Sequence, residues 1–174
     1  MQGIQGIPEI RDLRTPQQGS ADLLRSVFRQ HAAGVAVITA TGERPVGLTA
    51  GSLCSVALEP PVISFNISTG SSCWPVISRA EHVVVHLLGE HQQGLATTFA
   101  RRGADRFAEH TGWAPGPRGI PVLDDVLAWL LCRVTARVPA GDHRIVVAGV
   151  VLGDLPGVGR PLLYHQGRYN ALKY

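Results

Sequence analysis

The chain has 174 residues, of which 45% are hydrophobic and only 17% are charged. So little charge excludes a disordered, solvated chain, and the length is enough for one domain with a substantial core. The formal net charge of +3 comes almost wholly from arginine, since Lys173 is the only lysine. No basic stripe with interleaved aromatic residues accompanies that charge, and we therefore expect no nucleic-acid partner.

Sequence signals for other compartments and common cofactor motifs are also missing. No apolar run approaches the roughly 20 residues that span a bilayer, and the N-terminus lacks a basic segment followed by an apolar one. Cys54, Cys73 and Cys132 form an odd set without CxxC spacing. We therefore expect a cytoplasmic protein with reduced thiols, no membrane partner and no metal site. The sequence has no phosphate loop, GxGxxG fingerprint or GxSxG elbow.

His82 and His86 have a spacing that would suit a metal if they lay on a helix. The three valines between them predict a strand instead, and four residues of a strand span roughly 13 Å. Two imidazoles so far apart cannot easily hold one ion. We therefore interpret the pair as structural.

An arm, a helix and three strands are predicted for the first part of the chain. Residues 1–19 are rich in Gly and Pro and predict an extended arm, mobile or packed on a neighbouring subunit, ahead of one domain over residues 20–174. Ser20 and Asp22 predict the start of a helix that runs to about Ala32. Apolar runs predict strands over residues 35–40, 46–49 and 62–67.

The later part of the chain is predicted to be mainly strand. Ser71 or Ser72 is expected to cap a short helix. Residues 103–121, with four Gly and three Pro, predict a loop. The remaining elements are a strand over 82–88, a helix over 90–101, two long strands over 129–138 and 144–152, and closing segments over 161–164 and 167–169.

These elements together predict a mostly β fold. Six or more strands, several of them almost continuously apolar, with a few peripheral helices are typical of a closed or nearly closed barrel. The strands do not alternate regularly with helices, which disfavours a parallel, doubly wound sheet.

Residues 47–55 (GLTAGSLCS) end a predicted strand in small and hydroxyl side chains. Small residues let a flat ligand approach the backbone N–H groups, and the hydroxyls of Thr49, Ser52 and Ser55 can add donors. An ordinary polar turn has the same composition. Both interpretations stay open on these residues alone.

Two further stretches carry polar groups in places that suit a ligand. Residues 66–72 (NISTGSS) lead into a predicted helix N-terminus, where backbone amides favour an anion such as phosphate; simple capping explains one serine of the run. Gly141 and Asp142 are standard turn residues between two strands, but His143 is less expected there. Its near-neutral pKa suits a pocket, although turn chemistry explains the dipeptide before it.

In this order the motifs resemble the short-chain flavin reductases, the NAD(P)H:flavin oxidoreductases of two-component monooxygenases. The resemblance covers residues 21–172. The segments that carry it are 34–39 (GVAVIT), 47–52 (GLTAGS), 55–61 (SVALEPP), 99–100 (FA), 105–107 (DRF), 141–143 (GDH), 161–164 (PLLY) and 167–169 (GRY). Their conjunction is more specific than any one of them.

The resemblance implies a split β-barrel homodimer with flavin bound near the subunit interface. It implies an enzyme that reduces FMN or FAD by hydride transfer from NADH, or less readily NADPH, and supplies reduced flavin to a partner monooxygenase. A flavin- or haem-binding protein of the same barrel type without reductase activity is the alternative. A non-enzymatic dimeric ligand-binding or interaction protein is a second alternative, from another class.

Carried over residue by residue, the resemblance also implies a set of cofactor contacts. Gly51 stands where family members often have Asn or another polar residue, so that only a backbone contact is expected there. The residues expected along the flavin are Thr49, Ala50, Gly51 and Ser52, with Ser55 and Asn66 nearby, Ser71 and Ser72 at its ribityl-phosphate side, Phe99 and Ala100 lining the pocket, and Arg106 at a phosphate. His143 and the segment Gly167, Arg168 and Tyr169 are expected to face the nicotinamide, with His143 positioning it.

Overall fold

A computed structural model describes residues 19–103, 105–109 and 112–172. The predicted arm lies outside these residues except for Gly19. The helices are α1 (Ala21–Phe28), α2 (Trp74–Ile77), η1 (Glu90–Gln92), α3 (Gln93–Ala100), α4 (Arg106–Glu109) and η2 (Pro117–Gly119). The strands are β1 (Ala33–Gly34), β2 (Ala36–Thr41), β3 (Pro45–Ala50), β4 (Cys54–Leu58), β5 (Pro61–Ser68), β6 (His82–Leu87), β7 (Trp113–Pro115), β8 (Pro121–Leu123), β9 (Ala128–Ala140), β10 (His143–Asp154), β11 (Leu162–His165) and β12 (Arg168–Ala171).

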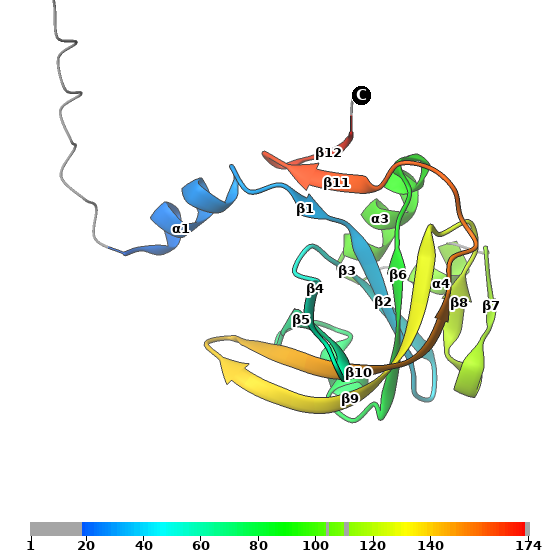
Figure 1. The fold of residues 1–174 in the computed structure, drawn as a ribbon. Coiled ribbons are helices and arrows are strands. Elements are labelled where there is room, and N and C mark those ends of the chain that lie inside the picture. The colour runs from blue at the N-terminus through cyan, green and yellow to red at the C-terminus, as the bar shows by residue number, and fades with distance from the viewer. Residues whose placement is uncertain (1–18, 104, 110–111, 173–174) are drawn as a thin grey trace, which may run out of the picture.

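The predicted mostly β fold is confirmed, and its main sheet is open, as the split barrel implied by the resemblance requires. Within the described residues, one antiparallel sheet has the order β3-β2-β6-β9-β10-β5-β4. It curls around a core, yet its two end strands, β3 and β4, are not hydrogen-bonded to each other there. A second sheet, β1-β11-β12, lies beside α3 (Figure 1).

The long β9–β10 hairpin gives the sheet much of its curvature. It is 13 residues long on one side and 12 on the other, which confirms the two long strands predicted there. The register shifts between Val147 and Ala148 and again between Val150 and Leu152, and such bulges bend and twist a strand pair. Gly141 has a φ of +58° in the connecting turn, a conformation that glycine adopts without strain.

The central strands β2 and β6 are buried on both faces, because each is an almost unbroken apolar run. Alternate residues of β2 therefore serve two cores. Ile38 faces a core inside the curled sheet that also holds Phe65. Val37 faces a second core beneath α3 that holds Leu95 and Phe99.

His86 lies in the buried strand β6, as predicted, and both of its ring nitrogens bond to backbone. Nδ1 donates to the carbonyl of Val37 at 3.0 Å, and Nε2 accepts from the N–H of Leu123 at 3.1 Å. The ring is therefore neutral, and burial lowers the pKa of His86 from 6.5 to about 4. The side chain joins β2, β6 and β8 without any need for a metal.

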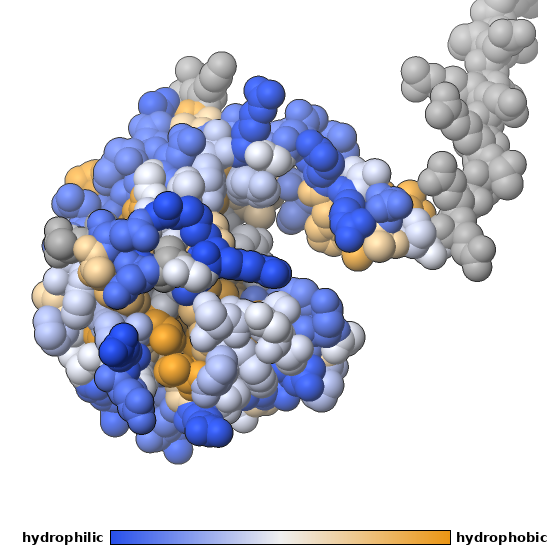
Figure 2. Space-filling view, turned by 180° about the vertical axis from the view of Figure 1, so that it is seen from behind, coloured by the Kyte–Doolittle hydropathy of each residue, from blue (hydrophilic) through white to orange (hydrophobic). Residues whose placement is uncertain are grey.

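The first helix is shorter than predicted. It is capped by Ser20, whose hydroxyl accepts from the N–H of Leu23, but it ends at Phe28 rather than near Ala32. The chain then turns because Ala33 is drawn into an antiparallel pairing with Tyr164 of β11. The apolar side chains of α1, namely Leu24, Val27 and Phe28, are 57–61% exposed. Figure 2 shows the helix projecting from the body with hydrophobic groups on its surface.

Three further predictions need correction. The segment after β3 returns as β4, because Cys54 pairs with Ser64 across the sheet edge. The predicted loop over residues 103–121 contains α4, β7 and η2 and the first residue of β8. The short helix α2 starts after Cys73, and the hydroxyl of Ser71 accepts from the N–H of Cys73 instead of capping the helix itself.

The contact between β3 and α3 requires a glycine. A Cβ on Gly47 would lie 2.5 Å from Cε1 of Phe99, whose side chain is only 1% exposed. Phe99 is held in turn by an edge-to-face contact with Phe107, with ring centroids 5.3 Å apart. The ring cannot move away cheaply, because closely packed cores resist an added methyl group.

We therefore predict that Gly47→Ala lowers the free energy of unfolding by about 1–3 kcal/mol. Urea denaturation at neutral pH measures it. Gly94→Ala in α3 is the matched control, because a Cβ there meets nothing within 4 Å and alanine favours a helix. A Gly47→Ala protein as stable as the Gly94→Ala protein would contradict the close packing.

We also predict that the protein loses stability as the pH falls from 6.5 towards 4. Above pH 6.5 His86 is neutral in both the folded and the unfolded protein. Below pH 6.5 His86 binds a proton in the unfolded chain, whereas the buried ring of the folded protein stays neutral. The difference in the pKa of His86 between the unfolded and folded protein corresponds to a loss of about 3 kcal/mol in the free energy of unfolding. Urea denaturation at pH 7.5, 6 and 5 should show the decline, and His86→Asn, though less stable, should show a shallower one. Equal slopes for both proteins would count against His86 as the source.

Candidate functional site

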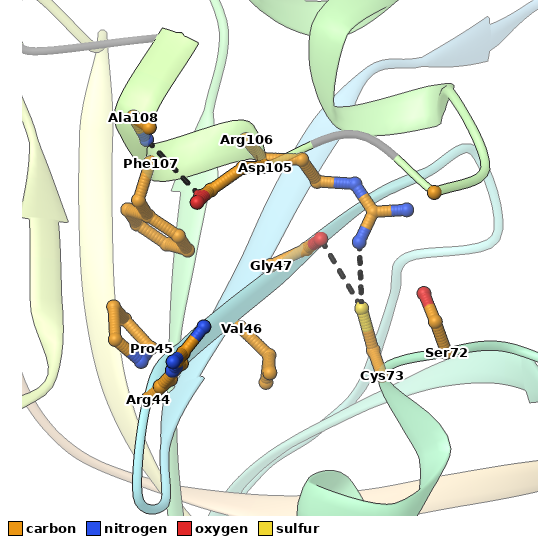
Figure 3. Close-up of a pocket in the computed structure, with 11 residues that line it drawn as sticks. Arg44, Pro45, Val46, Gly47, Ser72, Cys73, Asp105, Arg106, Phe107 and Ala108 are labelled. Carbon is orange, nitrogen blue, oxygen red and sulfur yellow. Dashed lines mark hydrogen bonds between the residues drawn. The ribbon is translucent and has the colours of Figure 1, made fainter.

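A cavity of about 600 Å³ opens between β3, the start of α2 and the start of α4. Its wall combines a backbone stretch without side-chain bulk at Gly47 with polar groups from two other segments. Ser72 comes from the loop after β5, and Arg106 is the first residue of α4 (Figure 3). The structure therefore brings Ser72 and Arg106, both expected at the flavin phosphate, to one cavity.

The guanidinium of Arg106 is held by two neutral groups. Nη1 donates to Sγ of Cys73 at 3.1 Å, and Nη2 donates to the carbonyl of Arg101 at 2.7 Å. Asp105 also lines the cavity, but its carboxylate accepts from the N–H of Ala108 at 3.2 Å (Figure 3). Neither of these hydrogen bonds of Arg106 therefore places a carboxylate against its positive charge.

Nε of Arg106 is buried and has no hydrogen-bond partner among the described residues. A buried donor of a charged group is costly when unpaired, so the atom fits a site that an acceptor completes. Ser72, exposed at the rim, adds a hydroxyl to the same cavity. This donor set suits a phosphate, which a guanidinium binds through several N–H groups.

A second cavity of about 550 Å³ lies on another side of α3. It brings together Ala100 and the whole GRY segment, residues 167–169, all of which the resemblance assigns to the cofactors. Tyr169 is half-buried and hydrogen-bonded to Thr97, and burial raises the pKa of its phenol. Arg101 links the two cavities, because it lines this one while its carbonyl holds Arg106.

The end of β3 and its following loop are tied to neighbouring elements through hydroxyls. Thr49 donates to the carbonyl of Ala96 in α3 at 2.7 Å, so its hydroxyl keeps only acceptor capacity for a ligand. Ser52 accepts from the N–H of Asn66 at 2.9 Å and can still donate. Ala50 is buried, whereas Gly51 and Ser55 are exposed.

His143 begins β10 at the tip of the long hairpin. His143 pairs with Ser68 of β5, and Asn66 stands two residues before Ser68 in the same strand. The side chains of His143 and Asn66 therefore lie on the same face of the β5–β10 pair. Nδ1 of His143 lies 2.7 Å from Oδ1 of Asp142, and this hydrogen bond lowers the pKa of the Asp142 carboxyl. Thr69 fixes the turn, because its N–H and hydroxyl both donate to the carbonyl of Asp142.

A family model described as "Flavin reductase like domain" matches residues 28–173. The chain belongs to the flavin reductase family. An NADH:FMN oxidoreductase of Rhodococcus qingshengii is 45% identical over 150 residues, which cover 83% of this chain and 78% of that protein. The reductase component of a 4-nitrophenol 4-monooxygenase/4-nitrocatechol 2-monooxygenase of Rhodococcus opacus is 37% identical, with coverage of 83% and 77%.

A solved structure agrees with this assignment. The crystal structure of a flavin reductase domain protein from Arthrobacter sp. FB24 superposes with a TM-score of 0.83 at 41% identity. The match covers 88% of this chain and 98% of that one. The resemblance seen in the sequence motifs is thereby confirmed at the level of family and fold.

Within this flavin reductase fold the expected site residues, apart from Ser71 and Phe99, fall into four groups. One group runs from the end of β3 to the start of β4 and consists of Thr49, Ala50, Gly51, Ser52 and Ser55. Ser72 and Arg106 share the first cavity, Ala100 and residues 167–169 share the second, and Asn66 and His143 share a sheet face. Ser71 lies behind Ser72 and stabilises the turn. Phe99 lies inside the core, where it supports the cavity wall from behind instead of lining it.

Sequence reasoning missed several residues of the first cavity, among them Arg44, Cys73 and Asp105. Arg44 stands in the turn before β3 and carries no pattern that marks a site. Cys73 was classed only as a structural thiol, although it directly follows the serine run. Cys73 and Arg106 are 33 positions apart in the chain, and no local sequence motif predicts a contact between them.

Proposed function

We propose that this protein is an NADH-dependent flavin reductase that reduces FMN or FAD and supplies the product to a monooxygenase. The observation that carries the proposal is Arg106, with a buried unpartnered Nε, in a cavity of a flavin reductase fold. The relatives named above support it: one is an NADH:FMN oxidoreductase, and another is a reductase component of a monooxygenase.

In this proposal Arg106 and Ser72 hold the phosphate side of the flavin. The guanidinium keeps its positive charge for the ligand, because the two groups that hold it are a thiol and a carbonyl. The ring system lies along the end of β3, at Thr49 and Ala50, and along the loop that follows it, at Gly51 and Ser52, which offer backbone groups. Ser55, Asn66 and Ser71 lie nearby. Phe99 contributes by fixing Gly47, and Ala100 by closing the second cavity.

The bound cofactors supply the hydride donor and acceptor themselves, so the protein needs to bind and orient them. His143 is suited to orienting the nicotinamide amide. When the ring is neutral and Nδ1–H donates to Asp142, Nε2 carries a lone pair that can accept from an amide N–H. Gly167, Arg168 and Tyr169 form a wall for the same nucleotide in the second cavity.

We further propose that two copies of the chain form the working enzyme. The exposed apolar side chains of α1 and of the β4 edge support this, since Leu58 is 81% exposed and Phe28 61%. No helix of the described residues is long and apolar enough to cross a membrane. We propose the cytoplasm as its location, because reduced flavin is to be passed to another enzyme. The mass of the protein in solution tests the dimer.

We predict that the purified protein oxidises NADH only when flavin is added. Oxidation followed at 340 nm, with FMN and FAD compared side by side and NADPH as the alternative donor, tests the proposal and ranks the cofactors. A protein that binds flavin yet leaves NADH unoxidised would be the flavin-binding alternative. A haem-binding protein would be revealed by binding haem, and a protein that binds neither would be the non-enzymatic alternative.

We predict that His143→Ala weakens NADH use far more than flavin binding. Loss of one hydrogen bond to the nicotinamide should raise the KM for NADH about tenfold, while the dissociation constant for FMN stays within about twofold. His91→Ala, at an exposed histidine of η1, is the matched control. An equal loss of NADH use and flavin affinity would refute the positioning role.

A further inference from the structure

We infer that Cys73 is a positioning residue, which holds the Arg106 guanidinium in place for the phosphate of a flavin. The inference rests on the proposed function, because it assigns a role within the same site. It concerns a residue that neither the sequence motifs nor the comparisons mark. Figure 3 shows the thiol between the backbone of β3 and the guanidinium, at the wall of the first cavity.

The Cys73 sulfur connects the backbone of β3 with the guanidinium of Arg106. It donates to the carbonyl of Gly47 at 3.2 Å and accepts from Nη1 of Arg106 at 3.1 Å. The side chain is 0% exposed, so water does not compete for either bond. A neutral thiol can make both contacts at once, since it has one S–H donor and a weakly accepting sulfur.

The thiol is itself fixed from both ends. Gly47 cannot shift, because Phe99 packs directly against it with no space for a Cβ. The segment that begins with Cys73 is also held at its far end, where Arg137 donates to the carbonyls of Ile77 and Ala80. Cys73 therefore fixes the Arg106 guanidinium at the cavity, because the thiol itself is held in place by the rigid core.

The chemical nature of the group that holds Arg106 affects phosphate binding as much as its position does. Other arginines of the described chain are paired with carboxylates, as Arg101 is with Glu109 and Arg160 with Glu90, although Arg137 is held by backbone carbonyls. A carboxylate would orient Arg106 equally well but would neutralise the charge that a phosphate needs. A thiol and a backbone carbonyl hold the cation without neutralising it. This arrangement leaves Nε to a ligand.

The test compares FMN with riboflavin, which has the same ring system and no phosphate. Titration of each flavin, followed by quenching of its fluorescence, gives two dissociation constants for each protein variant. We expect Cys73→Ala to weaken FMN binding about three- to tenfold and to leave riboflavin binding unchanged. Cys73→Ser should retain most of the FMN affinity, because a hydroxyl can also donate to Gly47 and accept from Arg106.

Cys132→Ala is the matched control, since Cys132 is also 0% exposed but lies in the sheet core away from this cavity. It should change neither dissociation constant. Arg106→Ala should abolish the preference for FMN over riboflavin in the same assay. Urea denaturation of all variants at neutral pH confirms that each is folded at the temperature of the titration.

The outcomes separate the two proposals. If Arg106→Ala abolishes the FMN preference and Cys73→Ala leaves it intact, the positioning role is wrong and the phosphate site stands. If Cys73→Ala weakens both flavins equally, Cys73 acts only on the stability of the site, and the inference is also overturned. If Arg106→Ala has no effect on the preference, or the wild type shows none, the proposed phosphate site itself fails.

Discussion

The close approach of β3 to α3 is the contact on which the rest of the site depends. Phe99 packs tightly on Gly47, and the same residue also lines the first cavity. The same helix carries Ala96, whose carbonyl fixes Thr49, and Ala100, which lines the second cavity. One packing contact therefore sets the position of both cavities, because a rigid core transmits displacement instead of absorbing it.

The positive charge of Arg106 depends on the absence of a carboxylate among the groups that hold it. Arg106 is held by a thiol and a carbonyl, whereas Arg101, five residues earlier, is paired with Glu109. Asp105 could have neutralised Arg106, but its carboxylate accepts from the start of α4 instead. The cavity therefore keeps a positive charge that can attract an anionic cofactor. A protein with a net charge of only +3 can provide such a local positive charge, because one guanidinium is not paired with a carboxylate.

Strands with unbroken apolar runs were predictable, and strands without them were not. The apolar runs predicted β2 and β6, which are buried on both faces, and also the long strands β9 and β10, which are only partly buried. The strand β4 (Cys54–Leu58) escaped prediction, since it lies at a sheet edge and its exposed residues carry no alternation. The end of α1 was also missed, because Ala33 joins a pairing with a strand 130 residues later.

The sequence by itself determined the family, the split-barrel fold that the resemblance implies and the mostly β class, since these depend on local motifs and apolar periodicity. Only the tertiary structure decided that Phe99 supports a wall instead of lining it and that Cys73 holds Arg106. Each of these facts is a contact between segments far apart in the chain. Local propensity does not specify such contacts; they arise when the sheet curls and brings β3, α2 and α4 together.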